Sequence, residues 1–163
     1  MTVHPFPPYF DEESEILILG SFPSVKSREN HFYYGHPQNR FWRVLANVFV
    51  EDTPVTVETK KAFLKKHHIA LWDVIASCDI TGSSDSSIKN VTPNDLSRIF
   101  RTAQIKQIFV NGKTAEKYYN RFIKNSDFRE AVCLPATSPA NAKFTVEKLT
   151  DEWNIICSFI NKH

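Results

Sequence analysis

Glu15-Ile16-Leu17-Ile18-Leu19-Gly20-Ser21-Phe22-Pro23-Ser24 joins an apolar run to a turn that contains glycine, proline and two serines. The run contains no polar residue after Glu15, which is typical of a strand buried on both faces of a sheet. In open α/β sheets, ligands bind at the carboxyl ends of the strands, where this turn lies. We therefore predict a buried strand over 15–19 that ends in a ligand-binding loop.

Three further apolar runs, at 69–75, 105–110 and 131–134, are each followed by a polar loop. Between the runs, apolar residues recur at helical spacing. The first predicted helix begins near Asn39 or Arg40. Further helices are predicted over 57–67, 113–123 and 145–160. Another is predicted over 96–103, with its start at 92–95. Strands that alternate with helices indicate parallel βαβ units. The prediction is an α/β fold, a three-layer α/β/α sandwich with a central four-stranded parallel sheet, in which residues 1–163 form one domain.

The composition is that of a folded protein with a weakly basic surface. Hydrophobic residues make up 42% of the 163 positions, which excludes a disordered chain, and the formal net charge of +2 permits a nucleic-acid partner without requiring one. Cys78, Cys133 and Cys157 are odd in number and lack C-x-x-C spacing, so we expect free thiols. No signal peptide or membrane-spanning run is evident, so we expect a soluble, cytoplasmic protein.

Parallel strands end at the same edge of a sheet, so four loops are expected to meet at one rim: 20–24, 73–87, 111–112 and 135–142. Three of them are rich in Ser, Thr, Asn and Gly, which suit phosphate binding but also form ordinary turns. A second polar segment, Tyr33-Tyr34-Gly35-His36-Pro37-Gln38-Asn39-Arg40-Phe41-Trp42, precedes an aromatic helix. Its side chains can hold a flat polar ring.

Four strings of this sequence resemble the motifs of one family. They are Gly20-Ser21-Phe22-Pro23-Ser24, Gly35-His36-Pro37-Gln38-Asn39-Arg40-Phe41-Trp42, Asn111-Gly112-Lys113-x-Ala115 and Leu134-Pro135-Ala136-Thr137-Ser138-Pro139-Ala140-Asn141-Ala142. Together they resemble the uracil-DNA glycosylase superfamily, above all its hypoxanthine-DNA (deoxyinosine) glycosylase branch. The resemblance implies an enzyme that flips a deaminated base out of DNA and hydrolyses its N-glycosidic bond without a metal or other cofactor. Hypoxanthine is the expected base, and uracil is the alternative.

The resemblance also implies roles for individual residues. Asn39 matches the catalytic asparagine of the deoxyinosine branch, although an asparagine directly before an apolar helix is also a favourable N-cap. Phe22 stands where mismatch-specific relatives carry a water-positioning asparagine. It is expected to cover one face of the flipped base, or else to pack in the core. Tyr34, with an exposed hydroxyl, is expected to stack on the other face. Ser21 is expected to read the base, or else to serve only its turn.

The remaining strand ends are expected to contact the base and the DNA backbone. Ala136 and Ala140 stand where many relatives carry a leaving-group residue and a wedge. Help for the departing base is therefore expected from Asn39, from backbone N–H groups or from the 73–87 loop, where Asp73 is a predicted base contact. The predicted phosphate and wedge contacts are Ser138 and Asn141, with the nearby lysines Lys26, Lys113 and Lys143.

A non-catalytic DNA-binding module of the same fold is the main alternative. Phe22 and the two alanines favour it, whereas the intact string through Asn39 opposes it. A serine hydrolase is disfavoured because the G-x-S-x-G elbow is missing, and His67-His68 lack metal-ligand spacing. Gly112-Lys113-Thr114 lacks the glycine that precedes it in a nucleotide-phosphate loop. We expect a monomer whose partner is DNA that contains a deaminated base.

Overall fold

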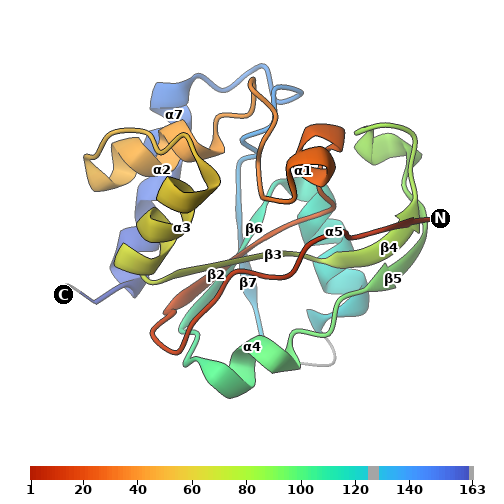
Figure 1. The fold of residues 1–163 in the computed structure, drawn as a ribbon, viewed down its shortest axis with the longest axis horizontal. Coiled ribbons are helices and arrows are strands. Elements are labelled where there is room, and N and C mark those ends of the chain that lie inside the picture. The colour runs from red at the N-terminus through yellow and green to blue at the C-terminus, as the bar shows by residue number, and fades with distance from the viewer. Residues whose placement is uncertain (125–128, 162–163) are drawn as a thin grey trace.

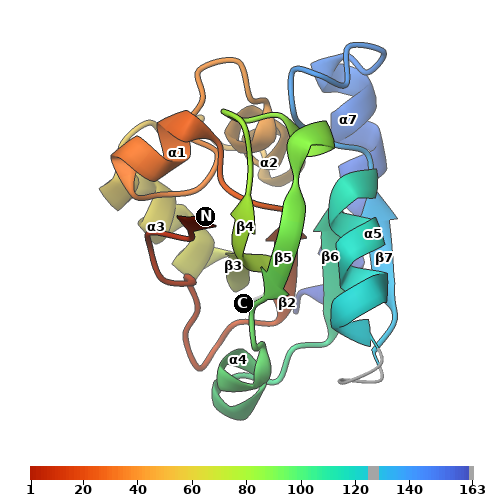
Figure 2. The same cartoon turned by 90° about the vertical axis from the view of Figure 1, so that its right-hand side faces the viewer.

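The computed structural model of this chain describes residues 1–124 and 129–161. Its centre is a sheet of four parallel strands in the order β3-β2-β6-β7 (Figure 1). The strands are β2 (Ile16–Gly20), β3 (Ile69–Asp73), β6 (Gln107–Asn111) and β7 (Ala131–Leu134). Helices cover both faces of this sheet (Figures 1 and 2). The predicted α/β/α sandwich with a four-stranded parallel sheet is confirmed.

Each face of the sheet has its own apolar core. The helices on one face are α2 (Phe41–Phe49), α3 (Val57–Lys66) and α7 (Val146–Trp153), and those on the other are α4 (Ser97–Thr102) and α5 (Lys113–Phe122). Ile16 and Ile18 belong to the first core, whereas Leu17 and Leu19 belong to the second. Because successive strand residues point to opposite faces, this uninterrupted apolar run serves both cores.

Three of the helices have a residue with a hydroxyl side chain at the N-cap. Ser24, Thr56 and Thr145 each accept a hydrogen bond from the backbone N–H three residues later, at the starts of α1 (Val25–Asn30), α3 and α7. Each bond satisfies a backbone donor that the helix itself leaves unpaired. The sequence therefore sets these helix starts locally, before any tertiary contact forms.

The structure contains a second sheet that the sequence analysis did not predict. Its antiparallel strands are β1 (Thr2–Val3), β4 (Ile75–Asp79) and β5 (Lys89–Pro93), in the order β1-β4-β5. The predicted single strand over 69–75 is thus wrong, because β3 ends at Asp73 and Ile75 pairs with Pro93 instead. Two strands that follow each other as one apolar run give no periodic signal at their junction.

Two other predicted boundaries differ from the structure, and one helix was not predicted. The helix start predicted at 92–95 is wrong, since Pro93 ends β5; proline fits this edge strand because it has no N–H to donate. The final helix is α-helical only to Trp153 and continues as the 3-10 helix η2 (Asn154–Phe159). Helix α1 was not predicted, because six residues are too few to reveal a helical period.

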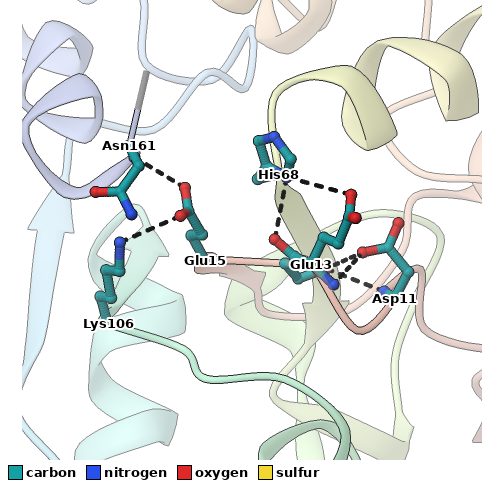
Figure 3. A network of polar contacts seen from close by, with 7 residues as sticks. Asp11, Glu13, Glu15, His68, Lys106 and Asn161 are labelled. Carbon is teal, nitrogen blue, oxygen red and sulfur yellow. Dashed lines mark hydrogen bonds and ion pairs between the residues drawn. The ribbon is translucent and has the colours of Figure 1, made fainter. Parts of the chain in front are cut away.

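A network of polar contacts closes the amino edge of the parallel sheet (Figure 3). Glu15 is only 8% exposed and accepts hydrogen bonds from Lys106 Nζ (3.2 Å) and from the backbone N–H of Asn161 (2.9 Å). His68 Nδ1 lies 3.1 Å from the carbonyl oxygen of Glu13. These contacts tie the segment after η2 to the start of β2. Across the two described ranges, no helix combines the length and apolar character needed to cross a membrane.

Candidate functional site

A cavity of about 350 Å³ lies at the carboxyl edge of the parallel sheet. The first strand of the parallel sheet, β2, lies between β3 and β6, so the chain leaves it on one side and later returns on the other. This is the topological switch point at which α/β sheets bind ligands, and the volume suits a small-molecule pocket. Seven of the ten predicted site residues line the cavity: Ser21, Phe22, Tyr34, Asn39, Asp73, Lys113 and Ser138.

A larger and more open hollow, of about 920 Å³, lies between α2 and α7. It is lined by four carboxylates, Glu51, Asp52, Glu147 and Asp151. Their negative charge is unsuited to the phosphate backbone of a nucleic acid. We therefore place the candidate site in the cavity at the sheet edge.

Asn39 is held through its side-chain oxygen. Its Oδ1 accepts hydrogen bonds from the backbone N–H of Phe41 (2.9 Å) and from the hydroxyl of Thr137 (2.9 Å). Because a backbone N–H requires an acceptor, the first contact also identifies which amide atom is the oxygen. Its Nδ2 makes no hydrogen bond to any residue in the described ranges. The N-cap of α2 is Arg40, so the N-cap position expected for Asn39 is wrong. Asn39 supports the start of the helix from one residue earlier and keeps two N–H donors for a ligand.

Thr137, to which the sequence analysis assigned no role, fixes the position of Asn39. It is fully buried, and its Oγ1 accepts a hydrogen bond from Asn111 Nδ2 (3.1 Å) while donating to Asn39. Its backbone N–H donates to Asn111 Oδ1 (3.0 Å). These bonds link the loop after β7 to the end of β6 and to the start of α2. Thr137 is 98 positions from Asn39, so no local pattern could have revealed the contact.

Arg40 is a second residue that the sequence analysis did not assign. Its guanidinium donates hydrogen bonds to the carbonyl oxygens of Thr137 (3.3 Å), Ser138 (2.8 Å), Asn141 (3.0 Å) and Phe144. A planar group with five N–H donors can satisfy several carbonyl oxygens at once. Arg40 therefore shapes the 137–144 loop, and its charge is directed to protein carbonyls.

Tyr34 lies beside the cavity with one face of its ring covered. The ring stacks on Phe41 at 3.9 Å between centroids, and the backbone has a φ of 53°. The predicted exposure of the hydroxyl is wrong, since Oη is buried and makes no geometrically sound hydrogen bond to a described residue. Burial and the charge of Asp73 raise the pKa of Tyr34 above its usual range. The phenol therefore remains protonated and can donate a hydrogen bond.

Asp73 lines the cavity although only 3% of its surface is exposed. Its Oδ2 lies 2.8 Å from Nε2 of His4, a residue that the sequence analysis did not consider for the site. Its Oδ1 lies over Gly20, where a Cβ would come within 2.5 Å of Oδ1 and within 3.0 Å of Tyr34 Oη. The absence of a side chain at Gly20 therefore lets an acceptor, Asp73 Oδ1, and a donor, Tyr34 Oη, lie close together.

Ser21 contacts a second carboxylate of the cavity wall. Its Oγ donates to Asp85 Oδ1 (3.3 Å), in the short 3-10 helix η1 (Asp85–Ser87). Burial raises the pKa of Asp85, as does the charge of Asp73, against the lowering effect of the Ser21 and Thr114 hydroxyls.

Phe22 packs in the core, which is one of the two roles that the sequence left open. It is 8% exposed, belongs to a core cluster and makes an edge contact with the His4 ring at 6.0 Å between centroids. It nevertheless contributes to the cavity lining. It can therefore contact a bound ring only through the small exposed part of its own.

Three of the predicted DNA contacts lie outside the cavity lining. Asn141 Nδ2 donates to the carbonyl oxygen of Ala136 (2.9 Å), so this side chain stabilises its own loop. Lys26, on α1, forms an exposed pair with Glu29 at 3.6 Å, and Lys143 is exposed. Lys113 and Ser138, by contrast, line the cavity.

Comparisons with known proteins agree with this architecture. A family model described as the uracil DNA glycosylase superfamily matches residues 7–157. The chain is 35% identical to a protein of Methanosarcina acetivorans named hypoxanthine DNA glycosylase, over 93% of this chain and 95% of that protein. It is 40% identical to a protein of the same name from Methanosarcina barkeri, over 69% of this chain and 73% of that protein.

A solution NMR structure of a putative uracil DNA glycosylase from Methanosarcina acetivorans has the same fold. It superposes with a TM-score of 0.79 at 35% sequence identity, and the match covers 93% of both chains. The family match, over residues 7–157, extends across all four strand ends that form the cavity. This chain belongs to the uracil DNA glycosylase superfamily.

Proposed function

We propose that this protein is a DNA glycosylase that removes a deaminated base, foremost hypoxanthine, by hydrolysing its N-glycosidic bond. The proposal is supported by the family membership, by the names of the two relatives and by a cavity at the sheet edge. A base inside duplex DNA cannot reach such a cavity, so the nucleotide must be flipped out of the stack. The product is an abasic site.

One observation carries the proposal most directly: Asn39 is anchored by its oxygen and keeps its amide nitrogen free beside the cavity. Water adds to C1′ of the sugar as the bond from C1′ to the base breaks, the electron pair of that bond leaves with the base, and the proton that the water loses ends on the released base. The departing base becomes negatively charged in the transition state. An N–H donor fixed before the reaction stabilises that charge without reorganising.

Asp73 and Tyr34 suit the recognition of a lactam base. Hypoxanthine and uracil both present a carbonyl oxygen beside a ring N–H, whereas adenine and cytosine present an amino group beside an unprotonated nitrogen. Asp73 Oδ1 can accept the ring N–H, and Asn39 Nδ2 can donate to the carbonyl oxygen. The exposed face of Tyr34 and the edge of Phe22 are placed to contact the ring. Ser21 contributes to the wall of the cavity through its hydrogen bond to Asp85.

A pair of substitutions at Asn39 separates catalysis from the support that its side-chain oxygen gives to the start of α2. Asn39→Ala removes both functions: we expect excision to fall by at least about a hundredfold, with a loss of about 1 kcal/mol in unfolding free energy. Asn39→Asp keeps the oxygen that binds Phe41 and Thr137 but removes the donor. We expect this variant to be as stable as the wild type and as inactive as Asn39→Ala. Single-turnover cleavage at deoxyinosine and urea unfolding measure the two effects, and full activity in folded Asn39→Asp would refute the donor role.

Lys113 and Ser138 lie where they can contact the phosphates next to the flipped nucleotide. We expect Lys113→Ala to reduce the slope of log K against log salt by about 1, as for the loss of one phosphate contact. Fluorescence anisotropy with a duplex that contains deoxyinosine measures this slope, and Lys26→Ala serves as an exposed control on α1. An unchanged slope for Lys113→Ala would remove Lys113 from the interface. Salt-dependent binding without excision in the wild type would instead favour a non-catalytic DNA-binding module.

A further inference from the structure

The amino-terminal segment places a histidine against the wall of the cavity. Residues 2 and 3 form β1, which pairs with β4, and the backbone N–H of His4 donates to the carbonyl oxygen of Ala76 (2.8 Å). His4 is thereby fixed beside the strand that begins directly after the end of β3. It precedes residues 7–157, which the family model matches, so its presence at the site does not follow from the family match.

The backbone of Asp73 and its carboxyl group are held by different parts of the chain. The backbone pairs with Gly20 at the end of β2, and its carbonyl oxygen accepts a hydrogen bond from Asn94 Nδ2 (2.8 Å). Within residues 1–124 and 129–161, the one hydrogen bond of the carboxyl group joins Oδ2 to Nε2 of His4, at 2.8 Å. Rotation of a carboxyl group about its last bond is otherwise broad. The His4 contact therefore determines where Oδ1 lies, which is over Gly20 at the cavity.

The geometry of the contact is enough for this effect. The side chains of His4 and Asp73 are 4% and 5% exposed, so little water can compete for the hydrogen bond. A hydrogen bond of this length fixes the plane of the carboxyl group whichever of the two atoms carries the hydrogen. The orientation of Oδ1 thus follows from the position of the imidazole.

Packing alone does not require an imidazole at this position. The rings of Phe6, Phe22 and Tyr33 surround it, at centroid distances of 4.6, 6.0 and 6.1 Å, and an apolar side chain would suit these neighbours. Nδ1 is buried without a hydrogen-bond partner among the described residues, which costs stability. The contact of Nε2 with Asp73 is therefore the feature that distinguishes His4 from an apolar residue of similar size.

We propose that His4 is a positioning residue that completes the base-recognition site from outside the residues that the family model matches. It holds Asp73 Oδ2, so that Oδ1 stays where the ring N–H of a lactam base can reach it. An acceptor whose orientation is fixed before binding needs no reordering when the base enters the cavity. Without the contact the carboxyl group rotates, and the base is held in a less productive position. This inference rests on the proposed glycosylase function.

Three substitutions at His4 test the reach of its side chain at a single pH. His4→Leu removes the hydrogen bond, His4→Gln places an amide as many bonds from the backbone as Nε2, and His4→Asn places the same amide only as far as Nδ1. At the lactam base that the wild type excises, we expect the single-turnover rate to fall at least about tenfold in His4→Leu and His4→Asn and to stay near the wild-type rate in His4→Gln. An amide can donate or accept, so this rescue does not depend on which partner carries the hydrogen.

Affinity and stability distinguish positioning from a general structural effect. The Kd for a duplex that carries this base should change by less than about threefold in the three variants, because DNA affinity comes mainly from phosphate contacts. Phe6→Leu alters the packing around the imidazole without removing the hydrogen bond, so we expect lower thermal stability with the wild-type rate. Equal losses of rate in folded Phe6→Leu and His4→Leu would overturn the proposal.

The outcomes separate this inference from the proposed function. A wild type that excises none of deoxyinosine, deoxyuridine and deoxyxanthosine would refute the proposed function and the role of His4 with it. An active wild type whose rate is unchanged in folded His4→Leu, or falls equally in His4→Gln and His4→Asn, would overturn the role of His4 alone. If the variants do not fold, a crystal structure of the wild type with a duplex that carries 2′-fluoro-deoxyinosine, which resists cleavage, decides. We expect Nε2 bonded to Asp73 Oδ2 and Oδ1 at the base, and a carboxyl group turned away from His4 would overturn the proposal.

Discussion

Gly20 ends β2 directly beneath the carboxyl group of Asp73. A Cβ at this position would lie 2.5 Å from Asp73 Oδ1 and 3.0 Å from Tyr34 Oη, which is closer than side chains tolerate. We expect Gly20→Ala to displace one or both groups and to reduce kcat/KM for deoxyinosine by at least about tenfold, since small misplacements in an active site are costly.

Gly35→Ala is the matched control for Gly20→Ala. A Cβ at Gly35 would meet the flexible end of Asn30 at 3.2 Å, outside the cavity lining, so we expect nearly wild-type excision. Thermal unfolding checks that both variants fold. Equal activity in the two variants would show that the distance between Asp73 and Gly20 is unimportant for the reaction.

At the residue scale, the sequence predicted the site residues that belong to a recognisable motif. It did not predict the residues that hold them in position. Asn39 and Tyr34 were found because they belong to a string that resembles a family motif, and the structure places both at the cavity. Thr137 and His4 were missed because their partners lie 98 and 69 positions away. The hydroxyl of Tyr34 was expected to be exposed because its burial depends on β2 and β3, which the local sequence does not show.

The loop after β7 is joined to the start of α2 by one side chain. Arg40 supplies hydrogen bonds to four carbonyl oxygens between Thr137 and Phe144. We expect Arg40→Met to leave these acceptors unpaired and to lower the unfolding free energy by about 2–3 kcal/mol. Excision should fall as well, because the same loop carries the Thr137 hydroxyl that positions Asn39.

Arg43→Met, on the exposed side of α2, removes the same charge without the loop contacts. Urea unfolding should give it the stability of the wild type. If Arg43→Met and Arg40→Met are equally stable, the carbonyl contacts of Arg40 contribute little, and the loop must be held by other bonds.

At the element scale, periodicity predicted the parallel sheet and most helices but not the second sheet. β2 and β6 each form one buried run, and the helices between the strands have an apolar stripe that packs on them. β4 directly follows β3, and β5 ends in a proline that also resembles a helix start. The sequence alone gave these two strands no distinct signal, so the amino-terminal segment and His4 could not be placed.

At the scale of the whole molecule, the Glu15 network and the cavity lie at opposite edges of the parallel sheet, so we expect the network to affect stability and the cavity to affect activity. The Glu15 network closes the amino edge of the sheet, whereas the cavity lies at the carboxyl edge, on the order of 16 Å away along the five residues of β2. We expect Glu15→Ala to lower the unfolding free energy by about 2 kcal/mol, because it removes the carboxylate that accepts hydrogen bonds from Lys106 Nζ and from the backbone N–H of Asn161.

Excision by Glu15→Ala should match that of the wild type well below the unfolding temperature. Glu15→Gln, which keeps an acceptor oxygen, should lose less stability. A large loss of kcat/KM in folded Glu15→Ala would mean that the two edges are coupled through β2, contrary to this separation.

Excision from matched duplexes that carry deoxyinosine, deoxyuridine, deoxyxanthosine, deoxyadenosine or deoxyguanosine at one position is the most direct test of the account. Alkaline strand cleavage after single-turnover incubation measures it. The account predicts abasic sites at the deaminated bases, fastest at deoxyinosine, and none at deoxyadenosine, with the activity lost in Asn39→Asp; guanine shares the lactam edge of hypoxanthine, so deoxyguanosine reports whether that edge is sufficient for excision. Cleavage confined to deoxyuridine would contradict the assignment of hypoxanthine, and tight binding without cleavage at any base would contradict the glycosylase function itself.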